Sequence, residues 1–300
     1  MSASALPGEV RVAPPADPRP LRTLARSRTL RLATRIPGAR VADWRAGGPR
    51  RPGGALLDLL DAAVRSGPIR IAAGPAAGSL LPTGLLRTDH AQAGLLVRGA
   101  VEPPVAEALR RHLPAGGALW DVGANVGYFA LLGARLAGAG GQVLALDPVP
   151  EHARSVALVA ALNGLDGVHA LQLAAWREAG PVELVLPDDG AWAHLAATVA
   201  GRAPGRRLDA TAVRLDDLLD VDGVRPPDVV KIDVEGAELG VLEGLERTVA
   251  EHRPVLLVET HDTADAVAAW AADRDHRVEN LERPAPIAGP GGQLAALIPR

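Results

Sequence analysis

Strand-like and helical segments alternate regularly from residue 118 to the end of the sequence. Apolar runs such as ALWDV (118–122), QVLALD (142–147) and DVVKID (228–233) are each followed by a segment with helical periodicity. Alternation of this kind is typical of a parallel sheet with helices of about 10–15 residues on its faces. The last two runs, HRVENL (276–281) and LAALIP (294–299), have no helical segment between them. We therefore expect an α/β fold whose sheet ends in an antiparallel hairpin.

The N-terminal part of the sequence has a different composition. Residues 1–54 are rich in Pro, Ala and Arg, and residues 19–51 contain ten Arg against a single acid. Such a segment has little apolar surface to bury, so we expect residues 1–54 to be a flexible extension. Several of its Arg residues recur four positions apart, which leaves open a peripheral contact with an anionic membrane or with a protein partner.

Two further units follow this extension. Residues 55–117 predict helices and short strands that cap the core, with a helix at 55–65 and short strands within 68–101. Residues 118–300 predict the cofactor-binding domain, which carries the regular alternation of strands and helices.

Composition excludes several classes of function. The formal net charge is −3, so nothing in the overall charge predicts binding to nucleic acid. The absence of Cys excludes disulfides, zinc–thiolate sites and a Cys nucleophile. No apolar run approaches the roughly 20 residues of a membrane span, and the first 20 residues lack the apolar core of a signal peptide. We expect a cytoplasmic protein whose partner is a small molecule, and its oligomeric state is left open.

The segment DVGANVGYF (121–129) combines the end of a strand, a glycine-containing turn and the start of a helix. Dinucleotide-binding enzymes place a Gly-x-Gly-x-x-Gly turn here and bind the pyrophosphate at the helix N-terminus. This sequence has Gly123 and Gly127, but Asn125 replaces the middle glycine, and Asp121 lies before the turn. A carboxylate there would repel a pyrophosphate and attract a cation. S-adenosylmethionine, which carries a sulfonium and an amino group, therefore fits better than NAD.

A second acid, Asp147, ends the next strand of the predicted sheet. An acid at this place can accept hydrogen bonds from both ribose hydroxyls of an adenosine. The predicted cofactor-binding residues are therefore Asp121, Gly123, Asn125, Gly127 and Asp147. A purely structural turn with two exposed carboxylates is the alternative.

Eight segments occur in an order that is shared with a known family. They are GAVEPPV (99–105), DVGANVGYF (121–129), VLALDPVPEH (143–152), ALNGL (161–165), VRLDDLL (213–219), DVVKIDVEGAELGVLEGL (228–245), RPVLLVET (253–260) and LAALIP (294–299). With them the chain resembles the FkbM family of S-adenosylmethionine-dependent methyltransferases, and KIDVEGAE is the most specific match. The resemblance covers about residues 98–300. It implies a class I, Rossmann-like fold with a seven-stranded, mostly parallel sheet, and transfer of a methyl group to an oxygen.

The resemblance adds one residue to the predicted site and shows two departures. Glu102, in GAVEPPV, joins the predicted cofactor-binding residues. The family commonly has Glu where Asp147 stands, a change that keeps the carboxylate. After the third strand the family often has a small residue and then an acid, whereas this chain has Trp176 and Arg177. The contact on the adenine side is therefore left open.

Lys231 is the only lysine of the chain and lies inside the strand DVVKID. An unpaired charge in a buried strand is costly, so we expect carboxylates around it. Residues two apart point to the same side of a strand, which places Asp233 beside Lys231. We predict that Lys231 fits a narrow gap between carboxylates, where the planar guanidinium of Arg would not fit, and orients them. An ion pair that only stabilises the sheet is the alternative.

An alcohol acceptor must lose its proton as it receives the methyl group, so a general base is expected beyond the strand ends. His261 is the first candidate, and Asp233 or Glu235 could share or replace its role. Together with Lys231, these are the predicted catalytic residues. The ligand types also suit Mg²⁺ or Mn²⁺, but their spacing does not require a metal and none is assigned. The residues that could hold one are Asp233, Glu235, Glu259 and His261.

The predicted function is S-adenosylmethionine-dependent methylation of a hydroxyl on a polyketide, sugar or glycolipid. One alternative is a nucleotide-dependent oxidoreductase, which needs glycine in place of Asn125 and tolerates no acid at Asp121. The other is a non-catalytic subunit that binds the cofactor and methylates nothing. The presence of Asp121, Asp147 and the KIDVEG motif speaks against this second alternative.

Overall fold

A computed structural model describes 6–12, 68–82, 95–96, 98–187, 194–196, 198 and 205–300. The Arg-rich segment 19–51 and the predicted helix 55–65 lie outside these described residues.

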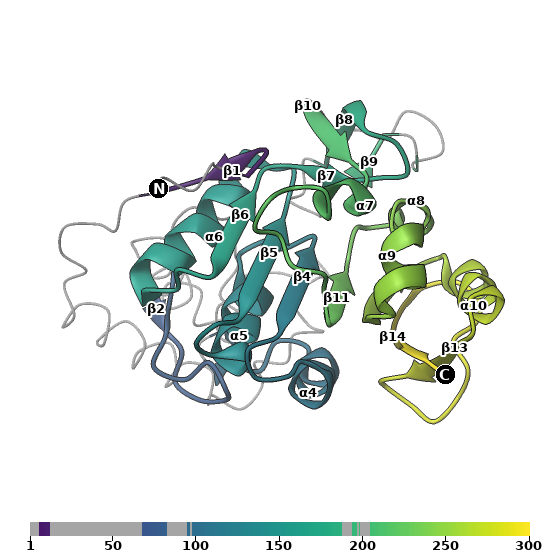
Figure 1. Ribbon diagram of the computed structural model, residues 1–300, viewed down its shortest axis with the longest axis horizontal. Helices are drawn as coiled ribbons and strands as arrows, with labels where there is room; N and C mark the ends of the chain where they lie inside the picture. Colours follow the sequence, from purple (N-terminus) through teal and green to yellow (C-terminus); the bar gives the residue numbers. More distant parts are fainter. Residues whose placement is uncertain are drawn as a thin grey trace, which may run out of the picture.

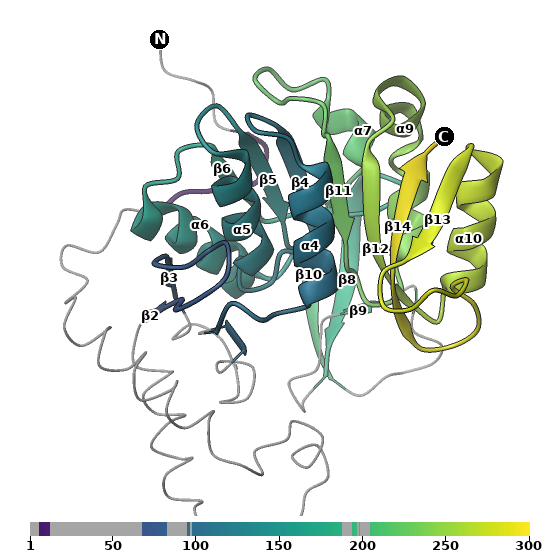
Figure 2. The same ribbon diagram turned by 90° about the horizontal axis from the view of Figure 1, so that it is seen from below.

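The main sheet has eight strands, and Figure 2 shows most of them side by side. In order across the sheet they are β1 (Glu9–Val10), β6 (Val168–Leu171), β5 (Gln142–Leu146), β4 (Ala118–Val122), β11 (Val229–Ile232), β12 (Val255–His261), β14 (Gly292–Pro299) and β13 (His276–Asn280). The five strands from β6 to β12 are parallel, and β14 runs antiparallel to both of its neighbours. The predicted, mostly parallel sheet with a C-terminal antiparallel hairpin is confirmed, but it has eight strands where the resemblance implied seven, because β1 adds to the edge at β6.

Helices cover both faces of this sheet, which explains why its central strands are apolar on both sides. On one face lie α4 (Pro103–His112), α5 (Tyr128–Ala137) and α6 (Pro150–Asn163), and on the other lie α7 (Leu215–Leu218), α8 (Glu238–Glu243), α9 (Glu246–His252) and α10 (Ala264–Asp273) (Figures 1 and 2). Alternate residues of β4 serve the two cores, Leu119 facing the first layer and Trp120 the second. None of the helices within the described part of the chain is long and apolar enough to cross a membrane.

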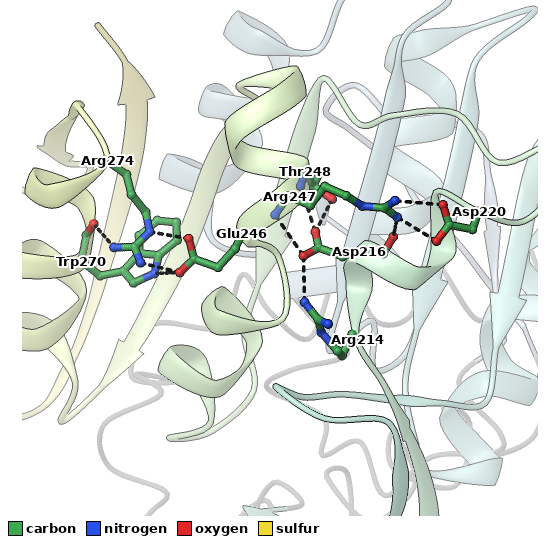
Figure 3. Close-up of polar contacts among 8 residues, drawn as sticks. All are labelled: Arg214, Asp216, Asp220, Glu246, Arg247, Thr248, Trp270 and Arg274. Atoms are coloured by element: carbon green, nitrogen blue, oxygen red, sulfur yellow. Dashed lines mark hydrogen bonds and ion pairs between the residues drawn. The ribbon is translucent and has the colours of Figure 1, made fainter.

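Two predicted elements are interrupted, each for a physical reason. The third predicted strand, 168–175, divides into β6 and β7 (Ala174–Ala175), and β7 leaves the main sheet to pair with β10 (Arg206–Val213). The predicted helix 237–250 breaks into α8 and α9. Asp216 of α7 accepts the backbone N–H groups of Arg247 and Thr248, so it caps a new helix start at this point (Figure 3).

A second, smaller sheet lies beside the main one, near the glycine-containing turn of residues 123–127. It consists of β7, β10, β8 (Gly180–Leu186) and β9 (His194–Leu195). Its inner face contributes Leu184 and Leu195 to a small apolar cluster with Ala237. A two-stranded sheet of β2 (Ile69–Arg70) and β3 (Leu80–Leu81) lies within the region where short strands were predicted.

Residues 6–12 correct the prediction that the first 54 residues form a flexible extension. Glu9 and Val10 form β1, which pairs antiparallel with β6 at the edge of the main sheet. Glu9 also contacts His169 of β6, with 3.0 Å between Oε1 and Nδ1. Pairing with an exposed sheet edge can order a short segment that has no core of its own. The domain boundaries at residues 54 and 117 stay predictions.

Candidate active site

The turn after β4 is shaped by close approach of the backbone. Gly123 has a φ of 77°, and a Cβ there would lie 1.8 Å from the carbonyl oxygen of Asp233, so no other residue fits. Asn125 is also left-handed, with a φ of 48°. Gly127 is the N-cap of α5 and lies against Val156 of α6, where a Cβ would come within 3.2 Å of that residue's Cα. Gly127 therefore allows two helices to pack and does not line the pocket described below.

Asp147 is fixed at the end of β5 by three neighbours. Its Oδ2 accepts the backbone N–H of Asn125 at 2.9 Å, and its Oδ1 accepts that of Val149 at 3.0 Å. The Nδ1 atom of His152 lies 3.1 Å from the same Oδ1. Burial of His152 opposes protonation of the imidazole, but Asp147 outweighs this and raises the pKa of His152. His152 ends the segment VLALDPVPEH but was not predicted as a site residue, and its contact depends on the first turn of α6.

An open pocket enclosing about 650 Å³, its mouth included, lies over this turn. Gly123, Asn125 and Asp147 line one side of it, and apolar side chains of the second sheet line another. Asp233 and Glu235 complete the lining from the end of β11. Three of the six predicted cofactor residues and two of the predicted catalytic residues therefore share one cavity, whereas Asp121, Gly127 and Glu102 do not line it.

Lys231 lies between two carboxylates, as its sequence position predicted. Its Nζ is 3.2 Å from Oδ2 of Asp233, 3.6 Å from Oδ1 of Asp121, and donates to the carbonyl of Gly123 at 3.2 Å. Lys231 is 4% exposed and Asp121 is fully buried. Burial raises the pKa of Asp121 although Lys231 opposes this shift, while Asp233 and Asp121 outweigh burial and raise the pKa of Lys231.

Several buried polar atoms here have no hydrogen-bond partner among the described residues. They are both carboxylate oxygens of Asp121, Oε2 of Glu102 and the hydroxyl of Tyr128. Glu102 precedes α4, has a φ of 36°, and lines a small cavity with Lys231, Asp233 and Glu259. Burial raises the pKa of Glu102 to about 7. Unsatisfied buried polar groups are rare in folded proteins, so this concentration marks a place where a ligand would supply partners.

His261, at the end of β12, is surrounded by carboxylates. Its Nδ1 lies 2.9 Å from Oε1 of Glu238, and its Nε2 lies 3.4 Å from Glu235 and 3.7 Å from Glu259. Burial opposes protonation of His261, but these acids, Glu238 foremost, raise its pKa to about 9. Burial also raises the pKa of Glu235, to about 7. His261 does not line the open pocket, whereas Glu235 does.

Glu238 is the functional candidate that sequence reasoning missed. Its position at the start of a helix suggested only a favourable interaction with the helix dipole. In the structure it is fully buried, and besides His261 it accepts the N–H of Gly236 and the hydroxyl of Thr263, both at 2.9 Å. The signal that could have identified it is its place inside KIDVEGAE, the most specific segment of the chain.

The two unusual residues after the third strand have structural roles. The ring of Trp176 packs on Gly240 of α8, where a Cβ would come within 2.1 Å of it. Arg177 pairs with Glu243 at 3.1 Å. Trp176 therefore joins the second sheet to α8, and neither residue lines the open pocket.

The parallel sheet covered by helices on both faces is a class I, Rossmann-like fold, and its cavity lies at the carboxyl ends of the strands. The family model of the methyltransferase FkbM domain matches residues 121–281, more than half of the sequence. The chain belongs to the FkbM methyltransferase family. No curated protein matches it.

Solved methyltransferase structures match this chain at low sequence identity and with TM-scores below 0.5. Methyltransferase FkbM from Methylobacillus flagellatus KT is 17% identical, with a TM-score of 0.45 over 76% of this chain and 56% of that one. A SAM-dependent O-methyltransferase from Thermotoga maritima is 13% identical, with a TM-score of 0.42 over 67% of this chain and 66% of that one. A SAM-dependent methyltransferase from Aquifex aeolicus is 17% identical, with a TM-score of 0.39 over 65% and 89%. The chain thus spans little more than half the length of the Methylobacillus protein.

Proposed function

We propose that this protein transfers a methyl group from S-adenosylmethionine to a hydroxyl of a small molecule of the polyketide, sugar or glycolipid type. The observation that supports the choice of cofactor is that most N–H groups of the glycine turn already have acceptors. The N–H groups of Gly123 and Ala124 bond to Leu146, that of Asn125 to Asp147, and that of Gly127 to Ala124. A pyrophosphate needs free N–H groups, whereas the side chains that concentrate around this turn are carboxylates.

The residues present fit S-adenosylmethionine, which supplies a methyl group on a positively charged sulfur. Asp147 lines the pocket, and backbone N–H groups already orient its carboxylate. It would accept hydrogen bonds from the ribose hydroxyls. Asp121 and Glu102 carry unsatisfied buried oxygens behind the turn, which make this end of the site favourable to a cation. Gly123 leaves no side chain between the turn and β11.

Proton removal from the acceptor is assigned to Glu235 on the ground of position. Glu235 lines the pocket and its Oε2 lies 3.4 Å from Nε2 of His261, which itself stands outside the lining. Glu235 would therefore accept the hydroxyl proton, while His261 and Glu238 hold its carboxylate in place. The structure thus favours Glu235 over His261, the candidate preferred from the sequence.

Calorimetry with Asp147→Ala tests the cofactor site. The change removes one or two charge-assisted hydrogen bonds, each worth about 1.5–3 kcal/mol, so the affinity for S-adenosylmethionine should fall at least tenfold. His169→Gln, which alters a histidine at the far sheet edge, is the control. Unchanged affinity of Asp147→Ala would overturn the site, and binding of NAD in preference to S-adenosylmethionine would overturn the function. Methylation of hydroxyl acceptors is followed by a 14-dalton mass increase.

A further inference from the structure

The ends of β11 and β12 bring together three side chains that are common metal ligands. Asp233, Glu259 and His261 each offer an atom, and these atoms all lie within 4.8 Å of one another. Two of the residues are acids and one is an imidazole, a set that is not explained by helix capping or by a surface ion pair. We propose that Asp233, Glu259 and His261 bind a divalent cation of the Mg²⁺ or Mn²⁺ type beside the cofactor pocket.

The imidazole of His261 is oriented for ligation. Glu238 is fully buried and lies 2.9 Å from Nδ1 of His261, so this nitrogen carries the ring proton. The other nitrogen, Nε2, faces Glu235 and Glu259, and binding a cation through Nε2 would replace its contact with Glu235. Metal-bound histidines usually donate their second N–H to a carboxylate or a carbonyl, which is the arrangement seen here.

The separations between the candidate ligands suit a small cation. Nε2 of His261 lies 3.7 Å from Oε1 of Glu259, which is too long for a hydrogen bond. Two ligands about 2.1 Å from one ion and at right angles to each other lie about 3 Å apart. A shift of less than an ångström, within the reach of side-chain rotation, would therefore close this pair around an ion.

A concentration of carboxyl groups at the same place is a second observation. Glu102 lines one small cavity with Asp233, Glu259 and Lys231, and its buried Oε2 has no hydrogen-bond partner. Lys231 is committed to Asp121, Asp233 and the carbonyl of Gly123. Burying carboxylates without cations is costly. A divalent cation would offset that cost at the point where acids converge.

The ligand types indicate which ion would bind. Carboxylate oxygens favour Mg²⁺ and Mn²⁺, and one imidazole is accepted more readily by Mn²⁺ than by Mg²⁺. Three protein ligands leave octahedral positions free for water or for an acceptor oxygen. Structural zinc sites instead have four nitrogen or sulfur ligands, and this chain contains no Cys.

The role of the ion in catalysis rests on the proposed O-methylation, although the site itself does not. Glu235 would take the proton of the acceptor hydroxyl, whose oxygen would bond to the methyl carbon. The bond from that carbon to sulfur would break with its electron pair staying on sulfur, which would give S-adenosylhomocysteine and a methyl ether. The ion would lower the pKa of the bound hydroxyl and hold it in line with the methyl group.

Mn²⁺ titration of the full-length, chelator-treated protein tests the site. Free Mn²⁺ gives a strong electron paramagnetic resonance signal that decreases on binding, and we expect one ion per chain. Asp233→Asn, Glu259→Gln and His261→Gln should each weaken binding at least tenfold. Glu238→Gln should weaken it about tenfold or more, because the imidazole loses its orientation. His169→Gln is the matched control, since His169 also contacts a glutamate but has no cluster around it, and it should bind as the wild type does.

Circular dichroism and calorimetry with S-adenosylmethionine separate the outcomes. Weaker Mn²⁺ binding in variants that keep their fold and their cofactor affinity supports the site. Equal Mn²⁺ affinity in the ligand variants and in His169→Gln means adventitious binding and overturns it. Cofactor binding without Mn²⁺ binding overturns the site and leaves the proposed function standing. Mn²⁺ binding at these residues without cofactor binding supports the site and overturns the proposed function.

Discussion

Two buried carboxylates of this protein are held in opposite ways. Asp216, in α7, is 2% exposed, and both its oxygens accept hydrogen bonds: Oδ1 from the N–H and hydroxyl of Thr248, and Oδ2 from the N–H of Arg247 (Figure 3). Asp121, in β4, is fully buried and has no hydrogen bond, and Nζ of Lys231 stands 3.6 Å away. A carboxylate that only stabilises a fold is surrounded by donors. The contrast separates the structural network around Asp216 from the region around Asp121, where buried oxygens have no donor among the described residues.

The cations of the two regions differ as well. In Figure 3 the guanidinium of Arg247 reaches both oxygens of Asp220, at 2.9 and 3.0 Å, and Arg274 reaches both oxygens of Glu246. The planar guanidinium of Arg matches the two oxygens of a single carboxylate. Lys231 instead faces three separate oxygen-bearing groups, which a compact ammonium with rotatable donors can serve. This geometry gives a physical reason for one lysine in a chain that otherwise uses arginine.

Lys231→Met is expected to have the largest effect, because it leaves buried Asp121 without a cation. Removing one partner of a buried ion pair typically costs about 3–5 kcal/mol in the free energy of unfolding. Urea denaturation followed by circular dichroism measures this loss. The double variant Lys231→Met/Asp121→Asn should recover most of the lost free energy of unfolding, since it no longer buries the unpaired carboxylate of Asp121. No recovery would show that the loss comes from packing alone.

Lys231→Arg preserves the charge and tests the steric part of the comparison. The larger guanidinium must enter a packed strand, which should cost about 1–3 kcal/mol. The reverse exchange, Arg274→Lys, affects a partly exposed pair and should cost less than about 1 kcal/mol. If Lys231→Arg had wild-type stability and turnover, the lone lysine would be an accident of codon usage.

Asp216→Ala removes the structural carboxylate and should leave the site intact. The N-terminus of α9 loses its cap, which is typically worth about 1–2 kcal/mol. The affinity for S-adenosylmethionine should stay at the wild-type value, in contrast to Asp147→Ala. A matching loss of cofactor affinity in Asp216→Ala would mean that the two regions are coupled.

The fold was predictable because its signals are local. The order of strands and helices, the hairpin and the cap at Gly164, which is left-handed with a φ of 61°, all follow from periodicity and turn chemistry. The pairing of Lys231 with Asp233 follows from their spacing of two in one strand. By contrast, β1 depends on an edge that the sequence does not reveal, and the break between α8 and α9 depends on Asp216, about 30 residues away along the chain.

The candidate site was predictable only in part, because many of its contacts are long-range. Glu102 reaches the neighbourhood of Lys231 from another element, and no pattern in GAVEPPV indicates that its oxygen is buried without a partner. The contact between Glu238 and His261 joins the start of α8 to the end of β12. Tyr128, the only tyrosine of the chain, places an unsatisfied hydroxyl in the same core. Such juxtapositions are set by packing, so they require the three-dimensional structure.

The smallest expected effect concerns the pair of Asp147 and His152. The hydrogen bonding of Asp147 is intermediate between that of Asp216 and that of Asp121. Like Asp216 it accepts backbone N–H groups, and like Asp121 it has a cationic partner, His152, at 3.1 Å. The pKa of His152 is raised above its ordinary value of 6.5. The pair therefore stabilises the fold fully below that value, and its contribution is lost as the pH rises through the raised pKa. His152→Gln should lower the melting temperature at pH 5.5 more than at pH 9, by an amount corresponding to less than about 1 kcal/mol. His169→Gln serves as the histidine control. A destabilisation by His152→Gln that grew with pH would contradict the assignment, because it would mean that neutral His152 is the form the fold prefers.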